Sequence, residues 1–407
     1  MPKLILKDAY KTFTRDQDKV LPPRATVTRL REKLGRLKLD ILKGTERIDN
    51  GRLGIPVFIS RCGRDAAGVT GTRKQMGKGA TAEQAEASAV MELVERFSFF
   101  SFARNPGRFI RATYGELGDR ALPFEMIARS VHDVSDELPA SRRLFESLPL
   151  QWTPATNLTR GSECLIPFDW FFAINEFNGP SAGNAPEEAI LQGICEVVER
   201  HVSALVSRGR IRLPGIRPDS VADPLVRDML AAYERCGIRL AVSDFTLDTG
   251  IPSIGVLAID PTTFPARSEM VWTAGTTPSP EKALSRALTE VAQLGGDFNT
   301  GACYVASGLP KVRRMEEADF ITRPSAVVDL SSLPDLSHPN MRVEIENCLQ
   351  ALARRDLEVL VVETTHPDIG LPAFYTIIPG AHFRERSRAS GVAMFAVKHL
   401  SEQWEPA

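Results

Sequence analysis

The sequence has few features of a membrane, secreted or nucleic-acid-binding protein. Its 407 residues contain no apolar run that approaches the roughly 20 residues needed to cross a bilayer. The apolar stretch at the start is too short for a signal peptide, so we expect a cytoplasmic protein. The formal net charge is −1, so no overall positive field attracts the chain to nucleic acid or to an anionic membrane.

Several familiar motifs of metal, nucleotide and hydrolase chemistry are also missing. Six cysteines and six histidines are scattered without a CxxC pair or an HExxH sequence, which argues against a zinc site and a disulfide framework. Residues 71–79 resemble a P-loop, but five residues separate the first glycines instead of four. Residues 179–183 spell GxSxG, but a loop-like segment precedes them, so we interpret them as a turn and not as a nucleophile elbow.

Three segments of the chain repeat one pattern of glycine, alanine and acidic residues. Glu92, Glu196 and Glu290 occupy the same place in each segment, at steps of 104 and 94 positions. The same steps connect further matching residues: Gly79 with Gly183, Ala85 with Ala189 and Ala283, Arg96 with Arg200, and Gln192 with Arg286. Several positions that keep one register indicate an internal repeat.

Each repeat predicts a helix that follows a glycine-containing turn. Thr81 and Gln84 have the spacing of a capping box, and Pro186 and Pro280 suit a first helical turn. A second recurrence, Gly-Ile-Pro or Gly-Leu-Pro, predicts three strand starts, and other apolar runs predict further strands; these lie at 54–58, 250–259, 370–374, 163–167, 238–245 and 357–363.

Strands that alternate with long helices predict an α/β or α+β fold. No low-complexity linker separates the repeats, so we expect one composite domain over residues 1–407, with its core at about 24–390. Residues 103–148 are polar and irregular, as expected of an insertion or a helical cover. A last short helix is predicted at 392–403.

Acidic and polar side chains form a stripe along each predicted helix. Residues three and four positions apart share one helix face, and the stripes are Ser88, Glu92 and Glu95; Glu188, Gln192, Glu196 and Glu199; and Arg286, Glu290 and Gln293. The remainder of the first two helices is mostly apolar, which predicts buried helices whose carboxylates face an interior cleft.

Buried carboxylates need a cation, and only Arg96, Arg200 and Arg286 are near in sequence. Magnesium is the simplest further cation, because it prefers oxygen ligands and bridges carboxylates to phosphates. The glycine turns would offer backbone N–H groups to anions, and the arginines would bind phosphate oxygens. For a single helix, salt-bridged glutamates on an ordinary amphipathic helix are an alternative explanation.

These motifs resemble those of the YcaO family. Residues 77–81 and 88–96 are similar to its SxxxExxE element, residues 184–200 to its second ATP element, residues 283–290 to its third, and residues 377–380 to a late strand. The resemblance covers roughly residues 24–379. It implies a composite fold with a central nucleotide cleft, in which ATP and Mg²⁺ serve to phosphorylate a backbone amide oxygen of a peptide.

The resemblance also implies roles for individual residues. The metal ligands would be Glu92, Glu95, Glu188, Glu196 and Glu199. The ATP-binding residues would be Ser88, Asn184, Gln192, Arg200 and Arg286, and both arginines would also stabilise the transferred phosphoryl group. Thr26 stands where the family has a small hydroxyl residue near the nucleotide, and either Lys19 or Arg24 would be the accompanying base.

The ends of the chain distinguish among the reactions of the family. Residues 401–407 do not match the proline-rich tail of azoline-forming members, and no fused peptide-binding domain precedes the core. The chain therefore resembles stand-alone, thioamide-forming members, which implies a peptide or protein substrate, a sulfide donor or a TfuA-like partner, and in many members a homodimer. Two alternatives are an azoline-forming cyclodehydratase and a nucleotide-binding accessory protein of a ribosomal-protein methylthiotransferase.

Overall fold

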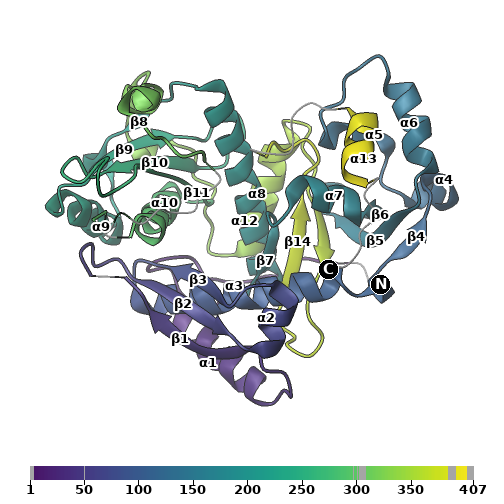
Figure 1. Cartoon of the computed structure of the whole chain (residues 1–407), viewed down its shortest axis with the longest axis horizontal. Helices are drawn as coiled ribbons and strands as arrows, with labels where there is room; N and C mark the ends of the chain where they lie inside the picture. Colours follow the sequence, from purple (N-terminus) through teal and green to yellow (C-terminus); the bar gives the residue numbers. More distant parts are fainter. Residues whose placement is uncertain are drawn as a thin grey trace.

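A computed structural model describes residues 4–49, 51–296, 298–299, 301, 309–383 and 391–400. Cys303 and residues 401–407 lie outside the described residues. The described chain forms three β-sheets, each with helices packed against it (Figure 1), and this mixed architecture confirms the predicted α/β fold. In the described part of the chain, no helix is both long and apolar enough to cross a membrane.

The first sheet is antiparallel, and its strands follow one another in chain order. Helix α3 (Ala82–Ala103) packs across it, and α1 (Pro23–Gly35) packs against α3. The other elements of this part are β1 (Leu42–Arg47), β2 (Val57–Cys62), α2 (Arg64–Thr70) and β3 (Lys74–Lys78).

The second sheet has the strand order β11-β10-β9-β8-β12. Helix α10 (Pro280–Gly295) covers β10 and β11, and α9 (Pro224–Arg235) packs against α10. The strands are β8 (Gly215–Ile216), β9 (Arg239–Asp244), β10 (Ser253–Ile259), β11 (Val271–Thr276) and β12 (Val327–Val328), and a short α11 (Asp319–Thr322) precedes β12.

The third sheet has the order β4-β5-β13-β14-β7, with β6 paired to β5. Its strands are β4 (Ile110–Ala112), β5 (Leu150–Asn157), β6 (Ser162–Pro167), β7 (Pro180–Ala182), β13 (Leu360–Glu363) and β14 (Ala373–Ile377). Helices α8 (Pro186–Gly209) and α12 (Met341–Ala353) lie between this sheet and the second one (Figure 1).

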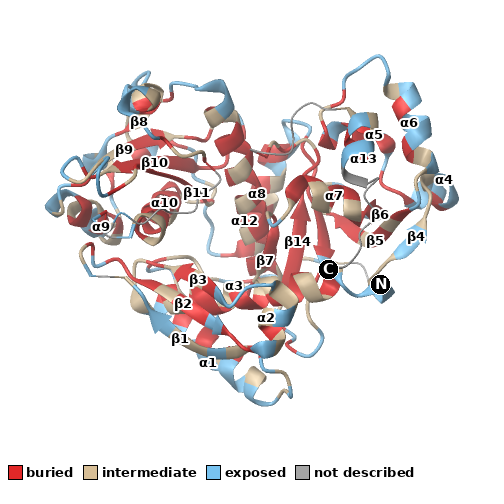
Figure 2. Cartoon of the chain, in the orientation of Figure 1, coloured by how far each residue is buried: buried red, intermediate tan, exposed pale blue. Residues whose placement is uncertain are grey.

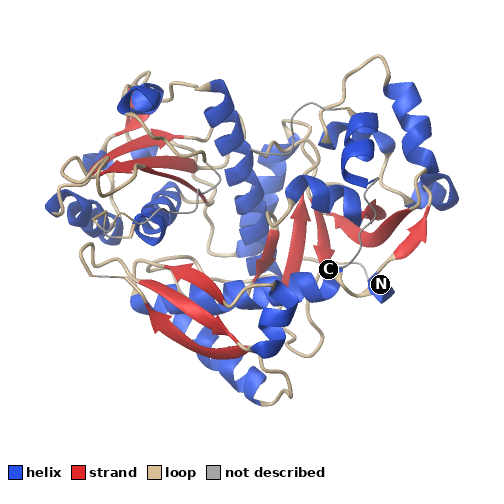
Figure 3. Ribbon diagram, in the orientation of Figure 1, coloured by secondary structure: helices blue, strands red, loops and turns tan. Residues whose placement is uncertain are grey.

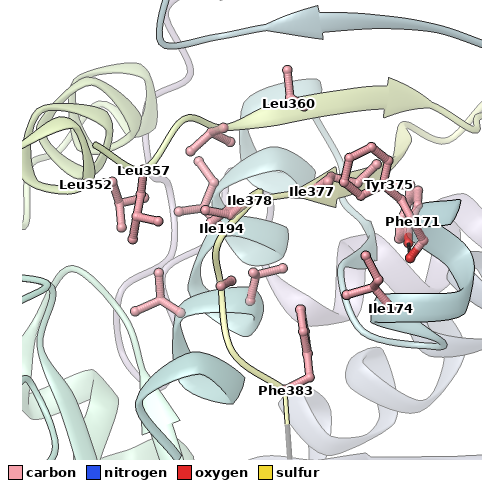
Figure 4. Packing of buried hydrophobic residues seen from close by; sticks show 14 of the residues in the cluster. Phe171, Ile174, Ile194, Leu352, Leu357, Leu360, Tyr375, Ile377, Ile378 and Phe383 are labelled. Atoms are coloured by element: carbon pink, nitrogen blue, oxygen red, sulfur yellow. Dashed lines mark hydrogen bonds between the residues drawn. The ribbon is translucent and has the colours of Figure 1, made fainter. Parts of the chain in front are cut away.

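The largest hydrophobic core surrounds the third sheet and α8. Ile194 of α8 lies beside Ile378, and Tyr375 lies close to Phe171 of α7 (Phe168–Asn175), as Figure 4 shows. The Tyr375 hydroxyl donates to the Phe171 carbonyl at 3.1 Å. Strands β10, β11, β13 and β14 are mostly buried, whereas the edge strands β1 and β4 are largely exposed (Figure 2).

Residues 103–148 fold over the outer end of the third sheet. They form β4 and three helices, α4 (Tyr114–Leu117), α5 (Phe124–Ser130) and α6 (Leu138–Ser147). Phe145 of α6 is fully buried against Trp170, with 5.2 Å between ring centroids. The predicted last helix is present as α13 (Val392–Leu400), which packs against α6 and α7, and residues 401–403 of that prediction lie outside the described residues.

The internal repeat predicted from the sequence is a strand followed by a helix. The three units are β3–α3, β7–α8 and β11–α10, and in each the strand is an edge strand of its own sheet (Figure 3). In each sheet, the strand that follows a Gly-x-Pro motif (β2, β14 or β10) pairs antiparallel with that edge strand. The middle unit therefore takes its inner strand from near the end of the chain.

The pairing register of these strands agrees with the sequence repeat. The third residue after each motif glycine, Val57, Ala373 or Ser253, faces Lys78, Ala182 or Thr276, respectively. Positions 78, 182 and 276 are separated by the same steps of 104 and 94 that relate the glutamates. The repeat is thus confirmed at the level of individual residue pairs.

One detail of the sequence interpretation was wrong. Residues 179–183 were expected to form a turn, but 180–182 form β7. Ser181 is fully buried, and its hydroxyl donates to the Phe374 carbonyl at 3.4 Å.

Candidate functional site

Helices α3, α8 and α10 line one cavity of about 300 Å³. Five acidic and five basic side chains face it: Glu92, Glu95, Glu188, Glu196, Glu290, Lys19, Lys78, Arg96, Arg200 and Arg286. Polar neutral side chains complete the lining, among them Gln17, Thr26, Ser88, Asn184, Gln192, Thr289 and Gln293. The three polar stripes therefore meet at one place, as their common repeat position predicts.

Glycines allow each strand to lie close to the helix of its own unit. A Cβ atom at Gly77 would stand 2.0 Å from the backbone nitrogen of Ala89, and one at Gly275 would stand 2.3 Å from the Ala283 carbonyl oxygen. At Gly183 the nearest atom would be the Ala189 nitrogen at 2.6 Å. These distances are too short for any side chain, so the glycine and alanine positions of the repeat are explained by close strand–helix packing.

Most of the predicted site residues lie at this cavity, with two exceptions. Arg24 points away from it: its side chain is 84% exposed and pairs with Glu83 at 3.4 Å. Lys19, the other candidate for the accompanying base, lines the cavity. Glu199 does not line the cavity and lies behind two arginines that do.

Glu199 is almost fully buried, and both of its oxygens face guanidinium groups. Arg286 Nε donates to Glu199 Oε2 at 3.3 Å, and an Arg200 nitrogen lies 3.4 Å from Oε1. Burial raises the pKa of Glu199, and the two arginines act against that increase. In this arrangement Glu199 orients the two arginines that the sequence assigned to phosphate oxygens.

The two arginines present donors toward the cavity. Arg286 also donates to Gln192 Oε1 at 2.9 Å, so the third and second units are joined directly. Arg200 Nε is buried and has no hydrogen-bond partner among the described residues. An unpaired buried donor is costly, and a bound anion would satisfy it.

Thr26, Asn184 and Glu188 form one hydrogen-bonded group at the start of α8. Asn184 Nδ2 lies 3.0 Å from Thr26 Oγ1 and 3.2 Å from Glu188 Oε1, to which it donates. The other Glu188 oxygen accepts from the Val20 backbone at 2.9 Å. The remaining polar atom of this group, Asn184 Oδ1, is buried and has no hydrogen-bond partner in the described structure.

Three carboxylates, Glu92, Glu95 and Glu196, surround Arg96, which lies 3.8 Å from Glu92 and 3.4 Å from Glu95. Burial raises the pKa of Glu92 and holds that of Glu95 well above its ordinary value; Arg96 opposes both shifts, and the neighbouring carboxylate of Glu196 adds to the shift of Glu95. Glu196 itself makes no hydrogen bond or ion pair with the described residues. This local excess of negative charge would favour a divalent cation.

The arrangement fits magnesium in one particular way. Among the described residues, no three acidic, histidine or cysteine side chains lie close enough together to hold an ion by themselves. Magnesium is usually held by one or two carboxylates, together with water and substrate phosphates. The cavity could therefore hold the ion together with a phosphate-bearing ligand, with Glu92, Glu95 and Glu196 as the available oxygen donors.

An ion pair at the cavity was missed from the sequence. Lys78, the last residue of β3, pairs with Glu290 of α10. Burial disfavours the ionised form of Glu290, but Lys78 and Arg200 hold its pKa below the ordinary value. Glu290 could have been included among the predicted site residues, because it stands at the repeat position of Glu92 and Glu196.

Lys19 and Lys78 add to the arginines near in sequence and neutralise part of the acidic lining. One expectation about anion binding was wrong. The backbone N–H groups of the turns before α3 and α8 are already used: Ala80 and Thr81 donate to Asp16, Asn184 donates to Glu188, and Gly183 donates to the Pro372 carbonyl.

Residues 76–382 match the model of the family described as YcaO cyclodehydratase, ATP- and Mg²⁺-binding. This match covers more than half of the chain, which therefore belongs to the YcaO family. Its cofactors are accordingly ATP and Mg²⁺. The membership predicted from the three polar stripes is thus confirmed.

Related sequences include proteins from an archaeon and a bacterium. An uncharacterized protein of Methanothermobacter thermautotrophicus is 29% identical over 84% of this chain and 90% of its own length. An uncharacterized protein in the tfuA 3′ region of Rhizobium leguminosarum bv. trifolii is 30% identical over 75% of this chain and 76% of its own length.

Similar solved structures support the fold. A heterocyclase in complex with substrate and cofactor has a TM-score of 0.73 at 24% identity; the match covers 94% of this chain but about half, 54%, of the heterocyclase. YcaO from Methanopyrus kandleri, bound with AMPPCP and Mg²⁺, has a TM-score of 0.67 at 22% identity and covers 92% and 95% of the two chains. At 24% and 22% identity, the similarity to these two structures shows that the fold is shared and says nothing of the activity.

Proposed function

We propose that this protein activates a peptide backbone amide with Mg-ATP in the cavity between α3, α8 and α10, and that the product is a thioamide. The observation that carries the proposal is the meeting of three repeat-related polar stripes at one cavity, in a family that binds ATP and Mg²⁺. The cavity is lined by both carboxylates and cationic groups. Guanidinium and ammonium groups bind phosphate oxygens and carboxylates bind metal ions, so this lining suits a phosphate-bearing ligand with a metal ion.

The residues at the cavity divide into three groups by chemistry. Glu92, Glu95 and Glu196 would hold Mg²⁺, which supplies positive charge to the phosphate oxygens when bound. Arg200 and Arg286, oriented by Glu199, would stabilise the charge on the transferred phosphoryl group. Thr26, Lys19, Ser88, Asn184 and Gln192 would bind the rest of the nucleotide. Glu188, predicted as a metal ligand, would orient Asn184, because its oxygens accept from Asn184 and Val20.

Phosphorylation overcomes the low reactivity of an amide. The amide carbonyl oxygen forms a bond to the γ-phosphorus of ATP. The bond between the γ-phosphorus and the oxygen that bridges it to the β-phosphate breaks, and ADP is released. Hydrogen sulfide then adds to the carbonyl carbon and loses its protons, and the C–O bond breaks so that the oxygen leaves within inorganic phosphate. The amide oxygen is thereby replaced by sulfur, with no net oxidation or reduction.

The choice of sulfide as nucleophile is supported by one relative. The Rhizobium protein in the tfuA 3′ region is similar to this chain over three quarters of both sequences. From this gene neighbourhood we infer that the present chain acts on a peptide or protein with a TfuA-like partner that delivers sulfide. The heterocyclase likeness makes azoline formation a second candidate, and the accessory factor of Escherichia coli, 29% identical over 53% of this chain, makes a supporting role a third.

The three candidates are distinguished by one experiment. A strain of the source organism that lacks the gene for this chain is complemented with the wild-type gene or with a variant. The digested proteins of the strains are then compared by mass spectrometry. The proposal predicts a peptide with one sulfur in place of one backbone oxygen, absent when Glu196→Gln replaces the wild type.

The other outcomes contradict the proposal. Loss of one water from a cysteine, serine or threonine site would instead indicate azoline formation. Restored methylthiolation of a ribosomal protein, with no other mass change, would indicate an accessory role.

A further inference from the structure

The segment before α1 forms a closed loop against the nucleotide cavity. Phe13 and Lys19 pair through their backbones: the N–H of Lys19 donates to Phe13 at 2.9 Å, and that of Phe13 donates back at 3.1 Å. We call residues 13–20 the N-terminal loop. Two of its side chains, Gln17 and Lys19, belong to the cavity lining.

Hydrogen bonds fasten the N-terminal loop to the start of each of the three repeat helices. The contacts are Ala80 and Thr81 N–H to Asp16 Oδ2 at 2.7 and 3.1 Å before α3, Val20 N–H to Glu188 Oε2 at 2.9 Å on α8, and Lys282 Nζ to the Arg15 carbonyl at 3.2 Å on α10. Because each helix packs on a different sheet, the loop links all three sheets at the cavity.

Asp16 is not needed to cap α3. That helix already has its own N-cap, Thr81, whose hydroxyl accepts from the Gln84 N–H at 3.3 Å. Asp16 is 1% exposed, and a carboxylate buried to that extent is costly unless its hydrogen bonds are useful elsewhere. Their effect here is to hold a loop 64 positions away in the sequence against the turn before α3.

We propose that Asp16 is a positioning residue of the nucleotide site: it holds the N-terminal loop so that Lys19 faces the cavity. Asp16 itself does not line the cavity, so its effect on a nucleotide passes through the loop. Lys19 Nζ lies 4.0 Å from Glu188 and is the cation that the loop contributes to the lining. The inference rests on nucleotide binding in this cavity.

A double-mutant cycle tests this inference. Binding of AMPPCP in the presence of Mg²⁺ is measured by calorimetry for wild type, Asp16→Ala, Lys19→Met and the double variant, with thermal denaturation of each. Asp16→Ala should weaken binding about tenfold, as expected when a charge-assisted contact is displaced. In the Lys19→Met background, Asp16→Ala should weaken binding less than about twofold. Once Lys19 is absent its position no longer matters, so the effects of the two substitutions on the binding free energy do not add.

A matched control lies on the same loop. Asp18 pairs with Lys11 at 2.7 Å instead of with a helix start, so Asp18→Asn should leave AMPPCP binding unchanged. Equal losses from Asp16→Ala in both backgrounds, or no loss in either, would overturn the inference while leaving the nucleotide site in place. Failure of the wild type to bind AMPPCP would overturn the nucleotide site itself, and the inference with it.

Discussion

Lys78 and Glu290 form an ion pair at the cavity although 212 positions separate them. Lys78 ends the strand of the first repeat unit, and Glu290 belongs to the helix of the third. Glu92 and Glu196, at the same repeat position as Glu290, lack a lysine partner of this kind in the described structure. The third unit therefore pairs its glutamate with a lysine, whereas Glu92 of the first unit lies 3.8 Å from Arg96 and is one of the proposed metal ligands.

Lys78→Met should destabilise the fold by about 3 kcal/mol, because it leaves a mostly buried carboxylate without its partner. Urea denaturation at neutral pH measures this loss. Since Lys78 helps to lower the pKa of Glu290, the stabilisation exists above the ordinary pKa of a glutamate and disappears as the pH falls through the lowered value. Adding Glu290→Gln to Lys78→Met should recover most of the loss; a difference that persists unchanged in acid would contradict this explanation.

Glu196→Gln and Glu199→Gln make a matched pair on α8. Glu196 makes no ion pair or hydrogen bond with the described residues, so its substitution should leave the melting temperature without ligand nearly unchanged. Glu199 holds Arg200 and Arg286, so its substitution should cost about 2 kcal/mol. Thermal denaturation without nucleotide compares them, and equal losses would argue against the assigned roles.

Arg286→Lys separates binding from stability. The contacts of Arg286 with Glu199 and Gln192 make a loss of stability the expected result of Arg286→Ala. Lysine keeps a positive charge beside Glu199 but cannot reproduce the two donors. AMPPCP affinity measured by calorimetry should fall about tenfold while the melting temperature changes little. Unchanged affinity would exclude Arg286 from the phosphate contacts.

The proposed role of Glu95 as a metal ligand, together with its raised pKa, predicts that magnesium binding depends on pH. A carboxylate with a raised pKa is protonated below it, and Mg²⁺ must displace that proton. Magnesium-dependent AMPPCP affinity should therefore increase as the pH rises through the raised value, measured by calorimetry at a series of pH values. Without metal, the raised pKa stabilises the fold at low pH, and this contribution disappears as the pH rises. A Glu95→Gln variant with the same pH profile would contradict the assignment.

Much of the fold and of the cavity could be predicted because the repeat consists of residue spacings within three short segments of the sequence. Steps of 104 and 94 positions identified three repeated helices, and the helix period placed Glu92, Glu196 and Glu290 on equivalent faces. The strands β3, β7 and β11 that precede these helices were not among the predicted strands. Gly79 and Gly183, where a Cβ atom would stand 2.7 and 2.6 Å from the nitrogens of Ala85 and Ala189, keep the step of 104. These are short-range patterns, which a single sequence contains in full.

Contacts between the units could not be read in the same way. The partner of Glu290 comes from another sheet, and the acceptor for the turn before α3 is Asp16, from a loop with no motif of its own. The repeat also placed Glu199 in the stripe beside Glu196, although the fold turns it toward two arginines. Such choices depend on how the three sheets pack together, which no local spacing encodes.

The central claim is that the meeting point of α3, α8 and α10 is a magnesium-dependent nucleotide site. Calorimetric titration of the purified protein with ATP, with and without Mg²⁺, tests it most directly, and Glu196→Gln serves as the comparison. We predict saturable binding by the wild type only when Mg²⁺ is present, and none by the variant. Binding that is equally strong without Mg²⁺, or in Glu196→Gln, would contradict the account.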